Sequence, residues 1–294
     1  MKNIKILYNQ NKLYNEVTGD AYYTNQRDEF SIRLVFNGNE HYTIGQKDFN
    51  IYPGNFLVIN DGTLYSRKIY SDIPVNTFAV MFSSAFLAEF HYNIIHDDIH
   101  LLENPYNFNK NSTPTFLETI YPFKGDMMYN LVHLTHHFHN WLIDELLIDE
   151  YIYHCLFLFY RLYHQEIVAK SEKLNMINYS TRIEVFKRLN LSKDFILSNY
   201  NRAITLEDIS HYCCLSTTHL FRTFKQVYYC SPHQYLMATR LKNAAYLLKT
   251  TNYEVNEVVN MVGFDSASSF IRLFKTRFKV TPVNYRNERM EITV

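Results

Sequence analysis

The chain has 294 residues, enough for two domains of ordinary size, and its 25 tyrosines and 22 phenylalanines beside only 7 glycines and 7 prolines exclude a disordered or low-complexity protein. Its 29 basic and 29 acidic residues balance, yet residues 181–294 hold 16 of the basic and only 9 of the acidic ones. A cationic C-terminal part beside an acidic remainder indicates phosphate binding by that part, and excludes a protein that coats nucleic acid with its whole surface.

The N-terminus and the cysteines indicate where the protein works. The first residues, MKNIKILYNQ, lack the apolar stretch of a secretory signal, and the longest apolar run, Tyr151–Tyr160, is interrupted by His154. We therefore expect a cytoplasmic protein without membrane contact. The four cysteines form no CxxC or paired framework, so we expect reduced cysteines that serve packing: Cys155, Cys213, Cys214 and Cys230.

Short runs of β-branched and aromatic residues occupy the segment from about residue 20 to residue 82. They are separated by Asn-Gly, Pro-Gly-Asn and Asp-Gly sequences, which favour tight turns. Such runs between turn signals are typical of antiparallel strands. The segment therefore predicts a small antiparallel barrel or sandwich.

After residue 84 the apolar pattern changes to helical spacing, with the better candidates for helices at 85–96, about 126–143 and about 145–170. The last two carry enough apolar surface for both a domain core and a partner helix: Leu131, Leu134, Phe138, Leu142, Tyr151, Cys155, Phe159 and Leu162. A helix pair packed within the chain and a dimer interface produce the same stripe, so both interpretations stay open.

Four histidines, His133, His136, His137 and His139, lie in the second of these stretches. Spacings of three and four residues on one helix can bring imidazoles together on a zinc ion. No cysteine or carboxylate lies beside them on that helix, however, and histidines shared between polar and boundary faces give the same spacing. We therefore predict no metal site and no cofactor.

The polar segment 171–182 is expected to link two domains, and residues 183–199 predict a helix. An internal repeat comes after that helix. Residues 216–225 (STTHLFRTFK) and residues 266–275 (SASSFIRLFK) share the pattern Ser-x-x-x-apolar-x-Arg-x-Phe-Lys at an offset of 50 residues. The same offset relates Tyr235 to Tyr285. A duplicated unit is therefore present.

Each copy has the parts of a helix-turn-helix motif, in which a scaffold helix and a tight turn place a second helix in a DNA major groove. In the first copy Thr205 caps the scaffold helix, Cys214 and Leu215 make the turn, and Ser216 caps the second helix. Leu220 and Phe224 of that helix face inward. The opposite face carries the predicted DNA contacts Thr217, Thr218, Phe221, Arg222 and Lys225.

In the second copy Gly263 makes the turn, and Ser266 caps a helix that buries Phe270 and Phe274. Its outer face supplies the predicted DNA contacts Ala267, Ser268, Ile271, Arg272 and Lys275. Between the copies, residues 232–249 predict a helix of roughly 25 Å at 1.5 Å per residue. A spacer of that length suits two adjacent major grooves about one turn apart.

Residues from about 180 to 290 resemble the DNA-binding domain of the AraC/XylS family of bacterial transcription regulators. The matching segments are LEDIS, LSTTHLFRTFK, SPHQYL, RLKNAAYLLKTT, VNEVVNMVGFDSASSFIRLFK and TPVNYR. The family usually has alanine in place of Ser210 and glycine in place of Tyr229 and Lys279, and a non-glycine residue at a left-handed position costs about 1 kcal/mol. The resemblance implies binding to double-stranded DNA in two adjacent major grooves and a homodimer, with RNA polymerase as a further candidate partner.

The segment Tyr52–Ile59 (YPGNFLVI) is similar to the turn-and-strand signature of the cupin-like sensor domains attached to many members of this family. The likeness implies that the barrel binds a small-molecule effector, and a sugar, a fatty acid or another metabolite fits it. Polar residues on otherwise apolar strands are the candidates for the ligand site: Arg33, His41, Tyr52, Tyr65 and Arg67. Metal-binding cupins carry a pair of histidines in the pattern HxH, whereas His41 has no such neighbour. The ligands of a catalytic metal are therefore missing, and catalysis is not expected.

The sequence thus predicts an α+β protein with a cupin-like β-barrel followed by helices at 1–172, for sensing and dimerisation. An all-α DNA-binding domain at 180–294 holds two helix-turn-helix motifs joined by a linker helix. The predicted function is a sequence-specific transcription regulator, not an enzyme. Two alternatives are a metal-dependent cupin enzyme fused to a DNA-binding module and a ligand-independent dimeric DNA-binding protein. Arg222 is expected to read a base and Lys225 to contact a phosphate, the alternative being that Arg222 also contacts a phosphate.

Overall fold

The computed structural model describes residues 2–104, 107–109, 113–138, 145–176 and 178–287. The chain divides into two compact units, Met1–Lys170 and Ser171–Val294. Within the described ranges, no helix is both long and apolar enough to cross a membrane.

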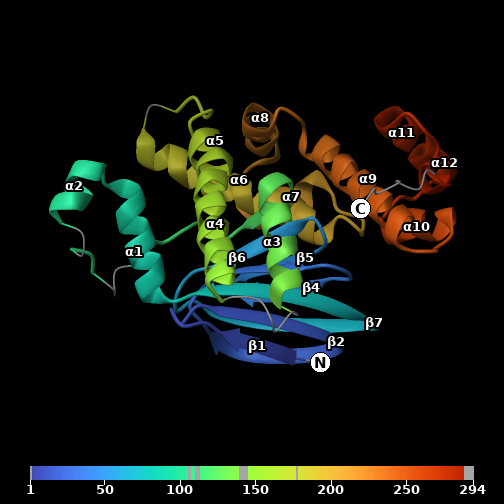
Figure 1. Cartoon of the computed structure of the whole chain (residues 1–294). Helices are drawn as coiled ribbons and strands as arrows, with labels where there is room; N and C mark the ends of the chain where they lie inside the picture. Colours follow the sequence, from blue (N-terminus) through green and yellow to red (C-terminus); the bar gives the residue numbers. More distant parts are fainter. Residues whose placement is uncertain (1, 105–106, 110–112, 139–144, 177, 288–294) are drawn as a thin grey trace. The chain divides into compact units, whose positions relative to one another are not determined.

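The N-terminal unit contains an eight-stranded antiparallel sheet (Figure 1). Six strands follow each other in the order β1-β2-β7-β3-β6-β8, and β4 pairs with both β5 and β7. The strands are β1 Lys2–Ile6, β2 Lys12–Arg27, β3 Phe30–Val35, β4 Glu40–Ile44, β5 Lys47–Ile51, β6 Asn55–Ile59, β7 Leu64–Phe82 and β8 Ile120–Pro122. The turn sequences between residues 36 and 63 are those expected, but the first two strands begin well before residue 20.

The two long strands β2 and β7 bend the sheet into a barrel-like shape. Their pairing shifts register between Thr18 and Asp20, where Gly19 lies so close to the partner strand that an added Cβ would stand 2.7 Å from the carbonyl oxygen of Ser71. On one side of the bend, residues 65–68 of β7 pair with β4. On the other side, residues 77–82 of β7 pair with β3. The long strand β7 therefore joins the β4–β5 hairpin to the rest of the sheet, which brings side chains from distant strands close together.

The helices of the N-terminal unit come after β7 in the chain. They are α1 Ser84–Ile95, α2 Asp98–Glu103, α3 Gly125–Phe138 and α4 Glu145–Tyr163, followed by a π-helical turn His164–Val168 and α5 Ala169–Ser171. Phe159 of α4 is fully buried, with its ring centroid 5.6 Å from that of Phe30 on β3 and 5.6 Å from that of Tyr121 on β8. Phe138 of α3 packs edge-on against Phe78 of β7 at 5.9 Å. These aromatic contacts form the core between the sheet and the helices.

The C-terminal unit is all helical. Its helices are α6 Tyr179–Asn199, α7 Leu206–Cys213, α8 Thr217–Tyr228, α9 Pro232–Thr250, α10 Val255–Met261, α11 Ala267–Phe278 and α12 Pro282–Asn287. The long helix α9 packs against α6 and α8 of the first motif and against α10 and α12 of the second. The antiparallel sheet with its helices and the all-α unit with two helix-turn-helix motifs confirm the fold class expected from the sequence.

Candidate nucleic-acid interface and ligand pocket

The first helix-turn-helix motif is built by local hydrogen bonds that its sequence supplies. The Thr205 N–H donates to Oδ2 of Asp208 at 2.8 Å, and the Asp208 N–H donates to Oγ1 of Thr205 at 3.1 Å, a capping box that begins α7. Cys214 ends α7 in a left-handed conformation, φ 53°. Ser216 then accepts the His219 N–H at 3.3 Å and begins α8. The predicted turn and caps are confirmed.

Helix α8 divides into a buried and an exposed face. Leu220, Phe224 and Val227 are fully buried, as the spacing predicted for the first two. Of the predicted DNA contacts, Thr217 is half-buried, and four are exposed: Thr218, Phe221, Arg222 and Lys225. Four exposed residues therefore lie on one side of a rigid helix, including an aromatic ring that is 45% exposed at Phe221.

The second motif repeats this division. Ser266 accepts the Ser269 N–H and begins α11, whose Phe270 and Phe274 are fully buried. Ala267 is half-buried like Thr217, its counterpart in the repeat. The remaining predicted contacts are exposed: Ser268, Ile271, Arg272 and Lys275.

Both outer faces carry cations that are available to an external anion. Within the described ranges, Arg222, Lys225, Arg272 and Lys275 form no ion pair. Helix α9 has 19 residues between the two motifs, which corresponds to about 28 Å at 1.5 Å per residue. The two faces can therefore supply charge-assisted hydrogen bonds to phosphates and base edges.

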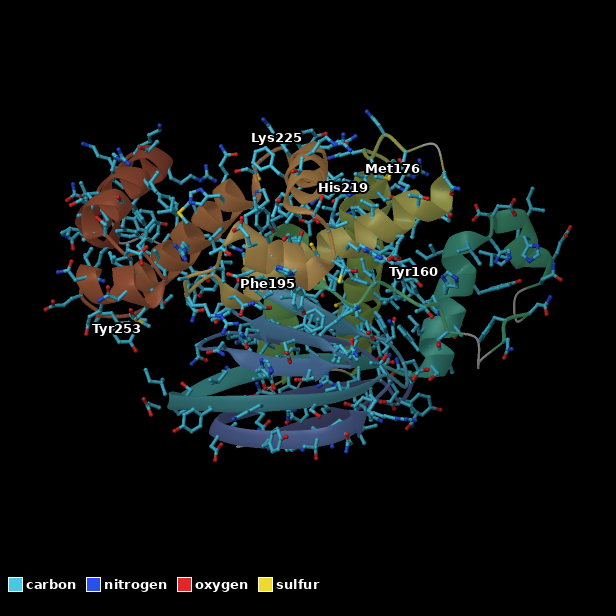
Figure 2. All side chains as sticks on the ribbon, turned by 180° about the vertical axis from the view of Figure 1, so that it is seen from behind. Tyr160, Met176, Phe195, His219, Lys225 and Tyr253 are labelled. Atoms are coloured by element: carbon cyan, nitrogen blue, oxygen red, sulfur yellow. The ribbon has the colours of Figure 1, made fainter. Side chains whose placement is uncertain are left out.

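Nothing in the sequence indicated that the segment before α6 contacts α8, the second helix of the first motif. Nε2 of Gln226 donates to the carbonyl oxygen of Lys173 at 2.7 Å, and the Lys173 ammonium lies 4.3 Å from the ring centroid of Tyr229. Asn175 and Met176 line a hollow of about 630 Å³ together with Phe221, Arg222 and Lys225 of α8. The polar composition of residues 171–182 predicted a linker but gave no signal for this packing; Met176 and Lys225 are labelled in Figure 2.

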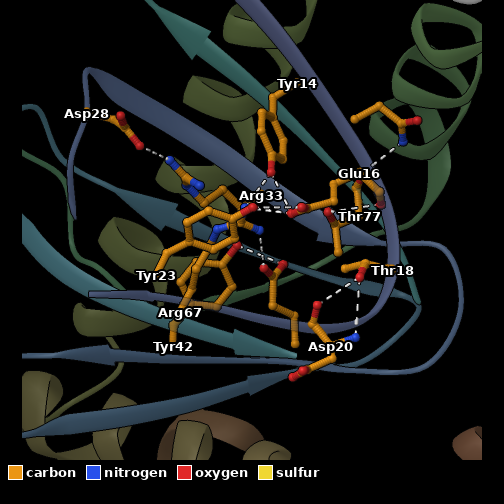
Figure 3. Close-up of polar contacts among 12 residues, drawn as sticks. Tyr14, Glu16, Thr18, Asp20, Tyr23, Asp28, Arg33, Tyr42, Arg67 and Thr77 are labelled. Atoms are coloured by element: carbon orange, nitrogen blue, oxygen red, sulfur yellow. Dashed lines mark hydrogen bonds and ion pairs between the residues drawn. The ribbon is translucent and has the colours of Figure 1, made fainter. Parts of the chain in front are cut away.

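The N-terminal unit holds a cluster of buried charges between β2, β3, β4 and β7 (Figure 3). Nη1 of Arg67 donates to Oε1 of Glu40 at 2.6 Å, and Nη2 donates to Oε2 of Glu16 at 2.7 Å. Nη2 of Arg33 donates to Oδ2 of Asp28 at 2.6 Å. Both arginines are at least 95% buried, so their carboxylate partners are needed to offset the cost of removing the charges from water.

Tyrosines complete this cluster. The Tyr14 and Tyr23 hydroxyls donate to the two carboxylate oxygens of Glu16 at 2.5 and 2.8 Å, and the Tyr65 hydroxyl donates to Asp28. Burial, and then the bond to Glu16, raises the pKa of Tyr14 far above its ordinary value, which keeps that hydroxyl a donor. Burial alone would raise the pKa of Glu16, but the hydrogen bonds from Tyr14, Tyr23 and Arg67 outweigh it and hold that pKa below its ordinary value.

A cavity of about 300 Å³ opens on this cluster. Three of the five predicted ligand residues line it, namely Arg33, Tyr65 and Arg67, together with Lys2, Ile4, Ile6, Lys12, Tyr14, Tyr23, Gln26, Asp28 and Met81. The other two do not: Nδ1 of His41 lies 2.9 Å from Oδ1 of Asn50 on the neighbouring strand, and Tyr52 follows β5. The polar alternation Tyr14-x-Glu16 on β2 was the available signal for the missed side of the cavity.

The histidine group on α3 does not assemble a metal site among the described residues, and His139 lies outside them. The ring centroids of His133 and His137 are 6.4 Å apart, and those of His136 and His137 are 5.8 Å apart. Burial, and then the neighbouring histidines His136 and His133, lowers the pKa of His137.

Comparison with known proteins matches residues 209–288 to a family model described as a helix-turn-helix domain. The raffinose operon transcriptional regulatory protein RafR of Pediococcus pentosaceus is 28% identical over 159 residues, 54% of this chain and 52% of that protein. The lactose operon transcription activator of Staphylococcus xylosus is 28% identical over 145 residues, 49% of this chain and 48% of that protein. The chain thus matches about half the length of each.

Among solved structures, ToxT of Vibrio cholerae O395 is 14% identical and covers 96% of this chain and 98% of its own, with a TM-score of 0.38. The C-terminal domain of AraT, a response regulator from Geobacillus stearothermophilus, is 29% identical and covers 36% of this chain and 91% of its own, with a TM-score of 0.34.

Proposed function

We propose that this protein is a transcription regulator that binds a specific DNA sequence and responds to a small molecule, because residues 209–288 of the C-terminal unit match a helix-turn-helix domain and resemble the AraC/XylS family. The DNA-binding domain spans 180–294 and the sensing domain spans 1–172. The observation that carries the proposal is the pair of recognition helices, α8 and α11, each of which presents an exposed arginine and an exposed lysine on its outer face, Arg222 with Lys225 and Arg272 with Lys275. The relatives named above are themselves transcription regulators, so no enzymatic step is part of the proposal.

Within each recognition helix the two cations take different roles. Arg222 and Arg272 lie one turn after Thr218 and Ser268, where a guanidinium reaches guanine O6 and N7 with two hydrogen bonds. Lys225 and Lys275 lie nearer the helix ends, and a flexible ammonium suits a phosphate. With α9 as the spacer, the two helices enter adjacent major grooves about one turn of DNA apart.

Selection of duplexes from a randomised library by the full-length protein tests this function. We expect a site with two half-sites, bound at least about a thousandfold more tightly than a scrambled duplex, with an affinity that falls steeply as salt rises. A protein with both Arg222→Ala and Arg272→Ala should lose most of that preference, whereas Lys242→Gln on an exposed position of α9 should keep it. Equal binding of the wild-type protein to selected and scrambled duplexes would refute sequence-specific regulation.

The cavity in the N-terminal unit supports a neutral, hydroxyl-rich ligand. Three of the four cations that line it are already paired: Arg33 with Asp28, Arg67 with Glu16 and Glu40, which do not themselves line the cavity, and Lys12 with Glu29 at 2.5 Å. An added carboxylate would leave a buried charge uncompensated, whereas hydroxyls can bond to the oxygens already in place. About 300 Å³ is at the lower end of the range for small-molecule sites.

A saccharide is the ligand class that these properties favour, and the names of two relatives refer to raffinose and lactose operons. Thermal unfolding of the purified protein with galactose, glucose, lactose, raffinose and octanoate tests it. A saccharide at 100 times its dissociation constant should stabilise the N-terminal unit by about 2.7 kcal/mol. Tyr23→Phe, inside the cavity, should weaken the effect, and His41→Gln, outside it, should not. Stabilisation by octanoate alone would contradict a neutral ligand.

A second copy of the chain is the proposed partner of the exposed apolar surface on α3 and α4. Tyr129, Leu146, Tyr153 and Phe157 are 65%, 74%, 48% and 44% exposed. Burial of such side chains against a partner removes apolar area from water, as in the homodimer that the family resemblance implies. Sedimentation should show a dimer that Phe157→Glu dissociates, and a monomeric wild-type protein at micromolar concentration would contradict the interface.

A further inference from the structure

One arginine of the linker helix contacts the turn that belongs to the first half of the C-terminal unit. Arg240 lies in α9 and is 93% buried. Its Nε donates to the carbonyl oxygen of Tyr200 at 2.8 Å, and its Nη2 donates to the carbonyl oxygen of Arg202 at 2.9 Å. Because the guanidinium is planar and rigid, two bonds to one turn fix both the position and the orientation of that turn relative to α9.

The turn of the second motif packs against the same residues. Gly263 adopts φ 81°, and a Cβ added to it would lie 2.8 Å from the carbonyl carbon of Asn201 and 2.9 Å from the carbonyl oxygen of Tyr200. The ring of Phe264, the next residue, has its centroid 5.7 Å from the Arg240 guanidinium carbon. We name this contact of Tyr200–Arg202, Arg240 and Gly263–Phe264 the junction.

The repeat shows that Arg240 is not part of the motif itself. Its counterpart 50 residues earlier is Asn190 on α6, whose Nδ2 donates to the carbonyl oxygen of Phe186 in its own helix at 3.0 Å. The first motif is therefore complete without a guanidinium at this position. Arg240, in the second copy, makes a contact that only the second copy has, because it bonds to the turn Tyr200–Arg202 in the first half of the unit.

We propose that Arg240 is a positioning residue that, with Gly263, holds the second helix-turn-helix motif at a fixed place relative to the first and so sets the half-site spacing that the protein accepts. The inference rests on the proposed DNA binding. One inserted base pair moves a half-site by about 3.4 Å and rotates it by about 35°. A rigid junction prevents α11 from following that movement, whereas a loosened junction permits it.

Binding affinities for duplexes that differ in the spacing between the half-sites measure how strictly the protein requires one spacing. The duplex selected by the full-length protein is compared with versions that have one base pair added or removed between the half-sites, and with a duplex that keeps only the first half-site. We expect the wild-type protein to bind the altered spacings at least tenfold more weakly. Arg240→Gln should reduce that penalty to threefold or less and leave affinity for the single half-site within twofold. Lys242→Gln, on the same helix, removes a charge from an exposed position and should keep the full penalty.

Two further variants alter the junction without removing its positive charge. Arg240→Lys keeps the charge but loses the two-pronged donor, and Gly263→Ala adds a Cβ against the backbone of Tyr200 and Asn201. Each should reduce the spacing penalty, and they replace Arg240→Gln if that variant does not fold. A folded junction variant that keeps the tenfold penalty would overturn the inference, as would a wild-type protein that tolerates every spacing.

A measurement without DNA separates this inference from the proposed function. Spin labels at Lys225→Cys and Lys275→Cys, with Cys214 and Cys230 changed to serine, report the distance between α8 and α11. We expect one narrow distance distribution, which Arg240→Gln broadens. An unchanged distribution would refute the positioning role even if DNA binding is established. Failure to select any duplex would refute the proposed function, and with it the role of the junction in spacing.

Discussion

The two helix-turn-helix motifs of the C-terminal unit have the same interior and different surfaces. In the first, Phe224 packs with Tyr228 and Tyr235 at centroid distances of 4.4 and 5.6 Å. In the second, Phe274 packs with Phe278 and Tyr285 at 4.5 and 5.3 Å. Every member of one triad lies 50 residues from its counterpart in the other. Duplication has therefore kept the packing that forms the fold.

The turns and the outer faces differ. Arg188 of α6 donates to the carbonyl oxygen of Cys214 in the first turn at 2.7 Å, whereas in the second turn Gly263 lies so close to the backbone of Tyr200 and Asn201 that an added Cβ would overlap it. Thr218 on the first outer face corresponds to Ser268 on the second, and aromatic Phe221 corresponds to aliphatic Ile271. The comparison teaches that the interior specifies a motif, while surface and turn specify what each copy contacts.

The largest expected effect tests whether the two interiors are equivalent. Phe224→Ala and Phe274→Ala should each destabilise the C-terminal unit by about 3–5 kcal/mol, because both side chains are fully buried and leave a cavity. Urea unfolding of the full-length protein, followed by far-ultraviolet circular dichroism, measures the losses. Phe221→Ala is the matched control on an exposed position of α8 and should change stability by less than about 0.5 kcal/mol. A loss below about 1 kcal/mol in either core variant would break the equivalence.

The next effect concerns the difference between the outer faces. Arg222→Ala should weaken binding to the selected duplex by about 1–3 kcal/mol and relax the preference at one base pair. Because the second face offers fewer hydrogen-bonding groups, we expect the stronger base preference in the half-site read by α8, about ten base pairs from the weaker one. Titrations of Arg222→Ala and Arg272→Ala on a library of single-base changes measure both. An Arg222→Ala protein with its full cognate-to-scrambled ratio would show that this arginine contacts only phosphate.

A smaller effect separates the lysine from the arginine within α8. Lys225→Ala should weaken binding to all sequences alike and reduce the slope of log affinity against log salt by about one, because one fewer counterion is released. Anisotropy titrations at several salt concentrations, on selected and scrambled duplexes, measure it, with Lys275→Ala as the equivalent change in the second motif. If Lys225→Ala changed the base preference but not the salt slope, Lys225 would read a base and would not contact a phosphate.

The smallest effect compares the positions that end the two recognition helices. Tyr229 and Lys279 both adopt left-handed conformations, φ 59° and 68°, where glycine is free of strain. Lys279→Gly should therefore stabilise the protein by about 0.5–1 kcal/mol. Tyr229→Gly should gain less, because it also loses the contact of the Tyr229 ring with the Lys173 ammonium. Equal gains in thermal unfolding would show that this contact contributes nothing to stability.

Local signals explain why the C-terminal unit could be predicted closely. The caps Thr205, Ser216 and Ser266 act within three residues along the chain, and the inward phenylalanines follow the helical repeat. The same reasoning failed at the start of the sheet, where polar residues on β2 concealed a strand that begins at Lys12. It also missed α2 and β8, which are short, and the packing of Lys173 against α8.

The sequence by itself determined the caps and turns of both motifs and which faces of α8 and α11 are buried, because these depend on neighbours a few residues apart. Only the tertiary structure decided which polar residues form the buried cluster beside the cavity: Arg67 bonds to Glu16 and Glu40, which lie 51 and 27 residues away, through pairings across β2, β4 and β7. It likewise decided that Arg240 contacts a turn about 40 residues earlier. Such contacts depend on how distant segments pack, and no local pattern of residue types encodes that packing.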